Sequence, residues 1–148
     1  WVQMNRRAYD IARKKVFYCK DTDTVPKIAK LLETLYINSI IVKDKTSKKI
    51  GMITVGDILK LIAKKREVHE LTAIDLMSEI VTLNRNVSID KLIDKFNETK
   101  VSRIVLIDKA GRFVGIVRNS SAYKYLAYSK FDKEAQKRFD RLWRRRLY

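Results

Sequence analysis

Hydrophobic and polar positions follow the same order twice along this chain. When the sequence is shifted by 64 residues, residues 16–64 align without a gap with residues 80–128, and apolar residues match at almost every position. Self-similarity over this length is the signature of a repeated structural unit. One copy buries too little surface to be stable alone, so the pattern predicts two copies that share a core.

Each copy predicts the same series of elements. A short extended segment comes first, residues 17–19 in one copy and 81–83 in the other. A helix follows, with Thr24 or Ser88 as its N-cap. Its apolar face has helical spacing and consists of Ile28, Leu31, Leu32 and Leu35 or of Ile89, Leu92, Ile93 and Phe96. Two short apolar runs, residues 39–43 and 50–54 in the first copy, then predict a hairpin, and a second helix closes the copy.

The predicted fold class is α+β: tandem β-α-β-β-α repeats with pseudo-twofold symmetry plus basic terminal helices. We expect a basic N-terminal segment or helix at 1–15, repeats at 16–66 and 80–128, a linker at 67–79, and a basic amphipathic helix at 129–148. Clefts between the repeats are the expected ligand sites. The predicted core is Ile28, Leu32, Ile40, Val42, Ile53, Leu92, Phe96, Val105, Ile107 and Val117.

The charge of the chain is strongly positive. Thirty-three Lys and Arg against 17 Asp and Glu give +16, which suggests anionic partners or simply confers solubility. A single cysteine, Cys19, excludes an internal disulfide and favours the cytoplasm. A single histidine, His69, argues against a zinc or haem site. No apolar run is long enough for a transmembrane helix, and a chain that opens with Trp1 is expected to be a piece of a longer protein.

Catalytic motifs are missing from the sequence. No phosphate-binding Gly-x-x-x-x-Gly-Lys loop occurs, and Cys19, in a predicted strand, is expected to be a buried, inert thiol. We therefore expect a protein that is not an enzyme and that requires no cofactor.

One motif does carry a functional signal. The first copy contains Gly51-Met-Ile-Thr54-Val-Gly-Asp57, and the second keeps Gly115-Ile-Val but has Arg118 and Ser121 in place of the Thr and the Asp. Two β-α-β-β-α copies with this motif resemble a CBS-domain pair, or Bateman module, over residues 8–128. The resemblance implies a homodimeric regulatory module that binds AMP, ADP, ATP, NAD or S-adenosylmethionine between the copies.

The resemblance also implies roles for individual residues. Asp57 would accept hydrogen bonds from ribose hydroxyls, or it would act only as a helix cap. Thr54 would lie near ribose or phosphate, and Gly51 would let another backbone approach closely. Arg103 would bind phosphate, and Arg118 would attract an anion. Positions near the base, where core packing is the stronger expectation, are Tyr18, Ile40, Ile80 and Val81. Because the second copy lacks the Thr and the Asp, we expect one competent site per chain.

The basic ends leave other functions open. Residues 130–148 hold eight Lys and Arg against three acidic residues, with an apolar side of Phe131, Ala135, Phe139, Leu142, Trp143 and Leu147. This segment is interpreted as a helix packed on the domain, a nucleic-acid contact or a membrane-surface helix. The alternative function is thus a nucleic-acid-binding protein with the CBS pair as scaffold. A third is a polyphosphate or anion binder that does not recognise adenine.

Overall fold

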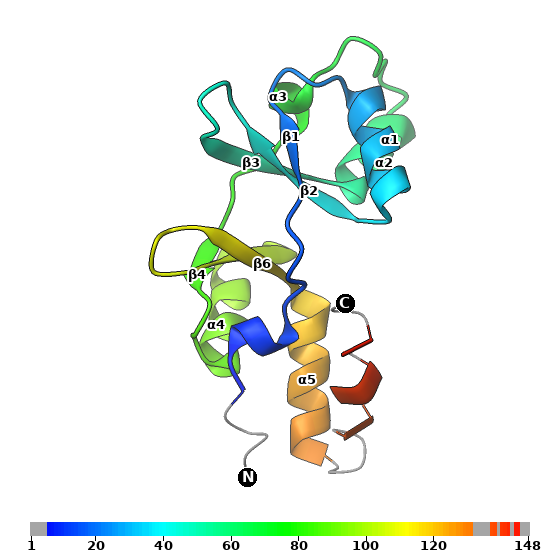
Figure 1. Ribbon diagram of the computed structural model, residues 1–148. Coiled ribbons are helices and arrows are strands. Elements are labelled where there is room, and N and C mark those ends of the chain that lie inside the picture. The colour runs from blue at the N-terminus through cyan, green and yellow to red at the C-terminus, as the bar shows by residue number, and fades with distance from the viewer. Residues whose placement is uncertain (1–5, 132–136, 139, 143, 146–148) are drawn as a thin grey trace. The chain divides into compact units, whose positions relative to one another are not determined.

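The computed structural model describes residues 6–131, 137–138, 140–142 and 144–145. The chain forms two compact units. The first-repeat unit spans residues 17–80, and the second-repeat unit joins residues from 81 onward to the segment before residue 17. Both units repeat the same order of elements, as Figure 1 shows.

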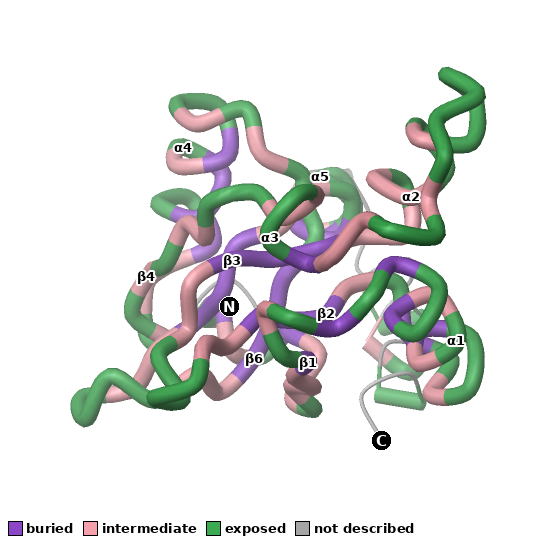
Figure 2. The backbone as a smooth tube through the Cα atoms, turned by 90° about the horizontal axis from the view of Figure 1, so that it is seen from above, coloured by how far each residue is buried: buried purple, intermediate pink, exposed green. Residues whose placement is uncertain are grey.

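The first-repeat unit contains a three-stranded sheet in the order β1-β2-β3. Strand β1 (Tyr18–Lys20) runs parallel to β2 (Ser39–Lys43), which pairs antiparallel with β3 (Lys49–Thr54). Helix α1 (Val25–Leu35) connects β1 to β2, α2 (Val55–Ala63) follows β3, and α3 (Ala73–Leu76) comes last. The middle residues of β2 and β3 are buried (Figure 2).

The second-repeat unit has the same topology. Strand β4 (Thr82–Asn84) runs parallel to β5 (Arg103–Ile107), which pairs antiparallel with β6 (Phe113–Arg118). Helix α4 (Ile89–Thr99) joins the first two strands, and α5 (Asn119–Phe131) follows the third. The prediction of two β-α-β-β-α copies is confirmed, with the first strand of each copy one residue later than expected.

The predicted caps explain where the first helix of each copy begins. The side chain of Thr24 accepts a hydrogen bond from the backbone N–H of Lys27 at 3.3 Å. Ser88 accepts one from the N–H of Lys91 at 3.2 Å. Each cap satisfies a backbone donor that has no partner inside the helix.

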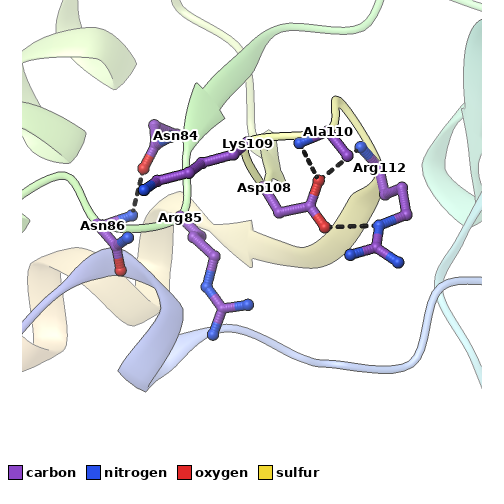
Figure 3. A pocket seen from close by; sticks show the side chains of 7 residues that line it. All are labelled: Asn84, Arg85, Asn86, Asp108, Lys109, Ala110 and Arg112. Atoms are coloured by element: carbon purple, nitrogen blue, oxygen red, sulfur yellow. Dashed lines mark hydrogen bonds and ion pairs between the residues drawn. The ribbon is translucent and has the colours of Figure 1, made fainter.

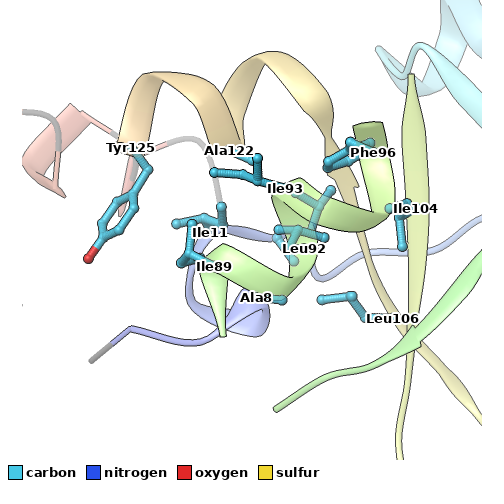
Figure 4. Packing of buried hydrophobic residues seen from close by; sticks show 12 residues of the cluster. Ala8, Ile11, Ile89, Leu92, Ile93, Phe96, Ile104, Leu106, Ala122 and Tyr125 are labelled. Atoms are coloured by element: carbon cyan, nitrogen blue, oxygen red, sulfur yellow. The ribbon is translucent and has the colours of Figure 1, made fainter. Parts of the chain in front are cut away.

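Each unit has one apolar cluster between its helices and one face of its sheet. Figure 4 shows the cluster of the second-repeat unit, where Ile104 and Leu106 face residues of α4 and α5. The predicted core was wrong at one residue of this strand. Ile107 is only half-buried, whereas Val105 is fully buried as predicted, although it lies outside the cluster. Side chains of a strand alternate between faces, so Val105 and Ile107 lie on the face opposite to that of Ile104 and Leu106.

The segment before each repeat packs in the unit of the other repeat. The short 3₁₀ helix η2 (Ala8–Ile11) precedes the first repeat but belongs to the second cluster, while Ala73 of α3 belongs to the first. Backbone bridges extend each sheet, between Met52 and Ser78 in one unit and between Arg13 and Ile116 in the other.

The two basic ends are described only in part. Among described residues before β1, only η2 is helical. At the other end α5 extends to Phe131, and the described residues from 137 onward are helical. Most of the expected apolar side lies outside the described residues; Leu142 is described and exposed. Across the part of the chain that is described, no helix is long and apolar enough to cross a membrane.

Candidate functional site

The Thr-x-x-Asp motif lies where β3 passes into α2. Thr54 is the N-cap of α2, and its hydroxyl oxygen accepts a hydrogen bond from the backbone N–H of Asp57 at 3.2 Å. In return, the backbone N–H of Thr54 donates to Asp57 Oδ2 at 2.8 Å. This reciprocal capping box fixes both side chains at the end of the sheet.

Part of this motif stays available for a ligand. Asp57 is half-buried, and its Oδ1 has no hydrogen bond to any other described residue. A carboxylate that uses one oxygen to cap a helix still has acceptor sites on the other. The Thr54 hydroxyl likewise keeps its proton for donation, because in the cap it only accepts.

Gly51 of the motif faces a neighbouring segment. A Cβ atom at this position would lie 2.6 Å from Met77 Sδ and 2.8 Å from Met77 Cβ. The backbones of Met52 and Ser78 exchange two hydrogen bonds of 2.9 Å beside it. Glycine therefore allows the segment after α3 to pair with β3.

The two copies differ in the pair of residues that lie opposite each other at the end of the hairpin. Ser39 lies opposite Thr54 in the first-repeat unit, whereas Arg103 lies opposite Arg118 in the second. Arg118 is exposed and has no ion pair with a described residue, and Arg103 donates to Ser102 Oγ at 3.3 Å. Like charges directly opposite on neighbouring strands repel each other, so this strand end favours an anion.

The structure thus brings Gly51, Thr54 and Asp57 together in one unit and the two arginines together in the other. The four residues expected near a base have varied surroundings. Ile40 is fully buried in the first cluster, and Val81 packs against the second. Ile80 is half-buried.

Tyr18 is covered by a cation. The ammonium of Lys43 lies 3.8 Å from the centre of the Tyr18 ring. Burial raises the pKa of the Tyr18 hydroxyl, so the side chain is neutral at physiological pH.

The thiol and the imidazole lie apart from any reactive arrangement in the described residues. Cys19 is 5% exposed, and burial raises its pKa to about 11. His69 is exposed and 3.5 Å from Glu67. No group of three His, Cys, Asp or Glu residues that could hold a metal ion occurs in the described part of the chain.

Sequence reasoning missed one feature, a pocket beside the β5–β6 turn that is lined by polar residues including Arg85 and Lys109. A sequence signal for it exists. Arg85 of the second copy corresponds to Asp21 of the first, so the charge at this place is reversed.

Comparison with protein families adds an independent finding. The family model described as CBS domain matches the chain twice, at residues 8–64 and 72–128. The CBS domain pair of protein MJ0100, crystallised in complex with 5′-methylthioadenosine and S-adenosyl-L-methionine, has the same fold. Its TM-score is 0.70 at 24% identity, covering 84% of this chain and 98% of that one.

Curated relatives are longer than this chain. The uncharacterized protein MK0525 of Methanopyrus kandleri is 24% identical over 110 residues, which cover 73% of this chain and 56% of that protein. The inosine-5′-monophosphate dehydrogenase of Methanocaldococcus jannaschii is 23% identical over 137 residues, which cover 93% of this chain and 27% of the enzyme. The chain therefore spans about half, or less, of the length of these relatives.

Proposed function

Because the chain belongs to the CBS domain family, with one copy at residues 8–64 and another at 72–128, we propose that it is a regulatory module that binds an adenosyl ligand. Proteins built on such pairs are generally regulated through them and do not use them for catalysis. The ligand class is AMP, ADP, ATP, NAD or S-adenosylmethionine, and the module requires no cofactor.

The observation that carries the proposal is the capping box of Thr54 and Asp57, which occupies only one of the two carboxylate oxygens of Asp57. Asp57 Oδ2 caps α2, and Oδ1 is free to accept a hydrogen bond from a ribose hydroxyl. The ribose of every ligand in the class presents two neighbouring hydroxyls, and a carboxylate is the acceptor best suited to them.

The arginine pair of the second-repeat unit is a proposed contact for an anionic group. Arg103 and Arg118 lie opposite each other at the end of the second hairpin, and Arg118 is exposed. Arginine binds phosphate or carboxylate oxygens with two parallel hydrogen bonds. Because the second copy has Ser121 in place of the acid, we propose one ribose-binding position per chain. The complex of MJ0100 with two adenosyl compounds supports this ligand class.

A matched pair of variants tests the proposal. Asp57→Ala removes the ribose acceptor together with a helix cap. Asp75→Ala removes an equivalent cap, since Asp75 Oδ2 accepts the N–H of Thr72 at 2.8 Å in the capping box of α3. Both variants should lose about 1 kcal/mol of stability, but only Asp57→Ala should lose the ligand.

The measurement is a thermal-shift and calorimetric titration with AMP, ADP, ATP, NAD, S-adenosylmethionine and GTP. A ligand at 100 times its Kd adds about 2.7 kcal/mol, which raises Tm by several degrees. If the unaltered chain shows no adenosyl-selective shift, or if Asp75→Ala abolishes binding as completely as Asp57→Ala, the proposal is wrong.

A second candidate function is nucleic-acid binding through residues 130–148. The observation in its favour is that the described basic residues of this segment are exposed: Lys137, Arg138, Arg141, Arg144 and Arg145. Exposed arginines on a helix bind phosphate backbones with strong salt dependence. Deleting residues 130–148 should abolish binding of a nucleic-acid oligonucleotide and leave the adenosyl ligand bound, whereas Asp57→Ala should do the reverse.

Assembly and location are also proposals. We propose that the chain forms a homodimer in the cytoplasm. Multi-angle light scattering of the purified chain should give about twice its mass of 17.4 kDa, and a single-chain mass would exclude the dimer.

A further inference from the structure

The two turns at the C-terminal ends of β4 and β5 enclose an open pocket of about 420 Å³ (Figure 3). Residues 84–86 line one side, and residues 108–110 and 112 line the other. Arg103 lies at the opposite end of β5, about 13 Å away at roughly 3.3 Å per residue. The pocket belongs to the second-repeat unit alone and is distinct from the strand end in the proposed function.

The single acid of the pocket is already paired. Asp108 Oδ1 accepts hydrogen bonds from the backbone N–H groups of Ala110 at 3.0 Å and Arg112 at 2.9 Å. Its Oδ2 accepts from Arg112 Nε at 2.7 Å. The N–H and the guanidinium of Arg112 hold the pKa of Asp108 below its usual range. The carboxylate therefore stabilises the turn. Because both of its oxygens already accept hydrogen bonds, it contributes little to binding or repelling a ligand.

Several donors around this acid have no partner among the described residues. Lys109 extends from the hairpin turn toward Asn84 and Asn86, as Figure 3 shows. Its ammonium makes no ion pair with a described residue, and Arg112 uses only Nε toward Asp108. Asn84 Oδ1 accepts the backbone N–H of Asn86 at 2.9 Å, so its amide nitrogen stays available to donate. The pocket is rich in donors and poor in free acceptors.

Two cations, Arg85 and Lys14, lie against the same aromatic ring beside this pocket. The guanidinium of Arg85, which lines the pocket, stacks on the Tyr9 ring with 3.8 Å between its central carbon and the ring centre. Lys14 Nζ lies 4.6 Å from the centre of the same ring. Burial, only partly offset by Asp10, and the charge of Arg85 lower the pKa of Lys14. Two cations gathered at one ring stabilise an anion bound nearby.

We propose that this pocket binds a small anion that carries two or more phosphate groups. Three cations, Arg85, Lys109 and Arg112, surround one acid that is already satisfied, and charge-assisted hydrogen bonds from them suit phosphate oxygens. The lining offers no exposed aromatic face for a base, so recognition depends on the phosphates. The three cations line one concavity and do not form an extended track, which favours a small anion over a nucleic-acid backbone.

The other hairpin of the chain shows that the fold does not require a cation at the place of Arg85. Asp44 stabilises the first-repeat turn as Asp108 does the second, accepting the N–H groups of Thr46 and Lys48 at 2.9 Å. The residue that corresponds to Arg85 is Asp21, and the one that corresponds to Tyr9 is Ile74. Lys109 and Arg112 have cationic counterparts in Lys45 and Lys48, so the second turn differs from its duplicate in Arg85 and in the stacking of Arg85 on Tyr9.

The test is calorimetric titration of the full chain with inorganic tripolyphosphate at moderate salt. The variant Lys109→Gln/Arg112→Gln removes two charges from the pocket. The matched control Lys45→Gln/Lys48→Gln removes two charges from the equivalent places of the first turn. We expect the pocket variant to weaken tripolyphosphate binding about tenfold or more and the control to leave it unchanged. Lys109→Gln alone should reproduce part of the loss without disturbing the turn.

Other outcomes would overturn the proposal. The proposal is wrong if tripolyphosphate does not bind, or if the pocket variant and the control lose affinity equally. It is also wrong if Arg118→Gln weakens tripolyphosphate binding and the pocket variant does not, or if the pocket variant weakens only the binding of an RNA oligonucleotide. S-adenosylmethionine carries no phosphate, so its binding reports on the proposed function separately. The pocket proposal does not rest on that function, and either can fail alone.

Discussion

Two glycines five residues apart in one motif should respond to the same substitution with opposite signs. Gly51 lies in β3, where an added Cβ would meet Met77 Sδ at 2.6 Å and Met77 Cβ and Cγ at 2.8 Å. Gly56 lies in the first turn of α2, where the nearest contact of an added Cβ is Thr54 Oγ1 at 3.6 Å. Gly56 also has no positive φ angle.

The magnitudes follow from these distances. Contacts under 3 Å do not occur for real Cβ atoms, so Gly51→Ala must push back the segment that carries Met77 and its backbone bridge to β3. Overpacking of this kind costs about 1–3 kcal/mol. Gly56→Ala adds no clash and restricts the unfolded chain, so it should stabilise the protein by about 0.4–1 kcal/mol.

Urea unfolding followed by circular dichroism measures both changes as shifts of the midpoint at constant m. For a chain of this size, 2 kcal/mol also corresponds to a Tm change of about 4–8 °C. Met77→Ala should rescue Gly51→Ala only in part, because Cβ of residue 77 remains within 2.8 Å of the new methyl group. Equal signs for the two glycine variants, or a neutral Gly51→Ala, would refute the reasoning.

Three further predictions concern single residues. Burial raises the pKa of Cys19 from 9.0 to about 11, so the folded chain holds this proton where the unfolded chain loses it. Stability should fall by about 2–3 kcal/mol in total as the pH rises from well below 9 to well above 11, and Cys19→Ala should remove that slope in unfolding measured against pH. Burial raises the pKa of Asp23, but hydrogen bonds from the Lys20 N–H and from Lys27 lower it further, so the net pKa lies below the usual value. Asp23→Asn should therefore cost about 1 kcal/mol of stability at neutral pH. If the same loss persists at a pH below the folded pKa of Asp23, this account is wrong. Tyr36 ends α1 at φ 54° and is 91% exposed, so Tyr36→Gly should stabilise the chain by up to about 1 kcal/mol in urea unfolding, and destabilisation would show that the ring has a packing role.

Local signals predicted most of the secondary structure. Thr24 and Ser88 precede helical periodicity, and the structure begins both helices there. The hairpins followed from two apolar runs around a polar turn, and the offset of 64 residues predicted that both copies share one topology. These features depend on side-chain spacing and on caps within a few residues, which the sequence displays directly.

The candidate site could be predicted only in part. The motif that contains Thr54 and Asp57 is contiguous, so its capping box followed from residues three apart. The pairing of Arg103 with Arg118 depends on strand register, and a shift of one residue in register would change which side chains lie on each face of the sheet.

The duplicated β-α-β-β-α order, the helix caps and the Thr-x-x-Asp motif follow from the amino-acid sequence alone, because each is encoded within a few neighbouring residues. Three features emerge only from the folded chain. The segment before each repeat packs in the unit of the other repeat, Gly51 accommodates Met77, and Tyr9, Lys14 and Arg85 meet beside the second hairpin turn. Most of these contacts join residues far apart in the sequence, such as Gly51 and Met77, 26 positions apart, or Tyr9 and Arg85, 76 positions apart. Burial of apolar surface brings such residues together without leaving a local pattern.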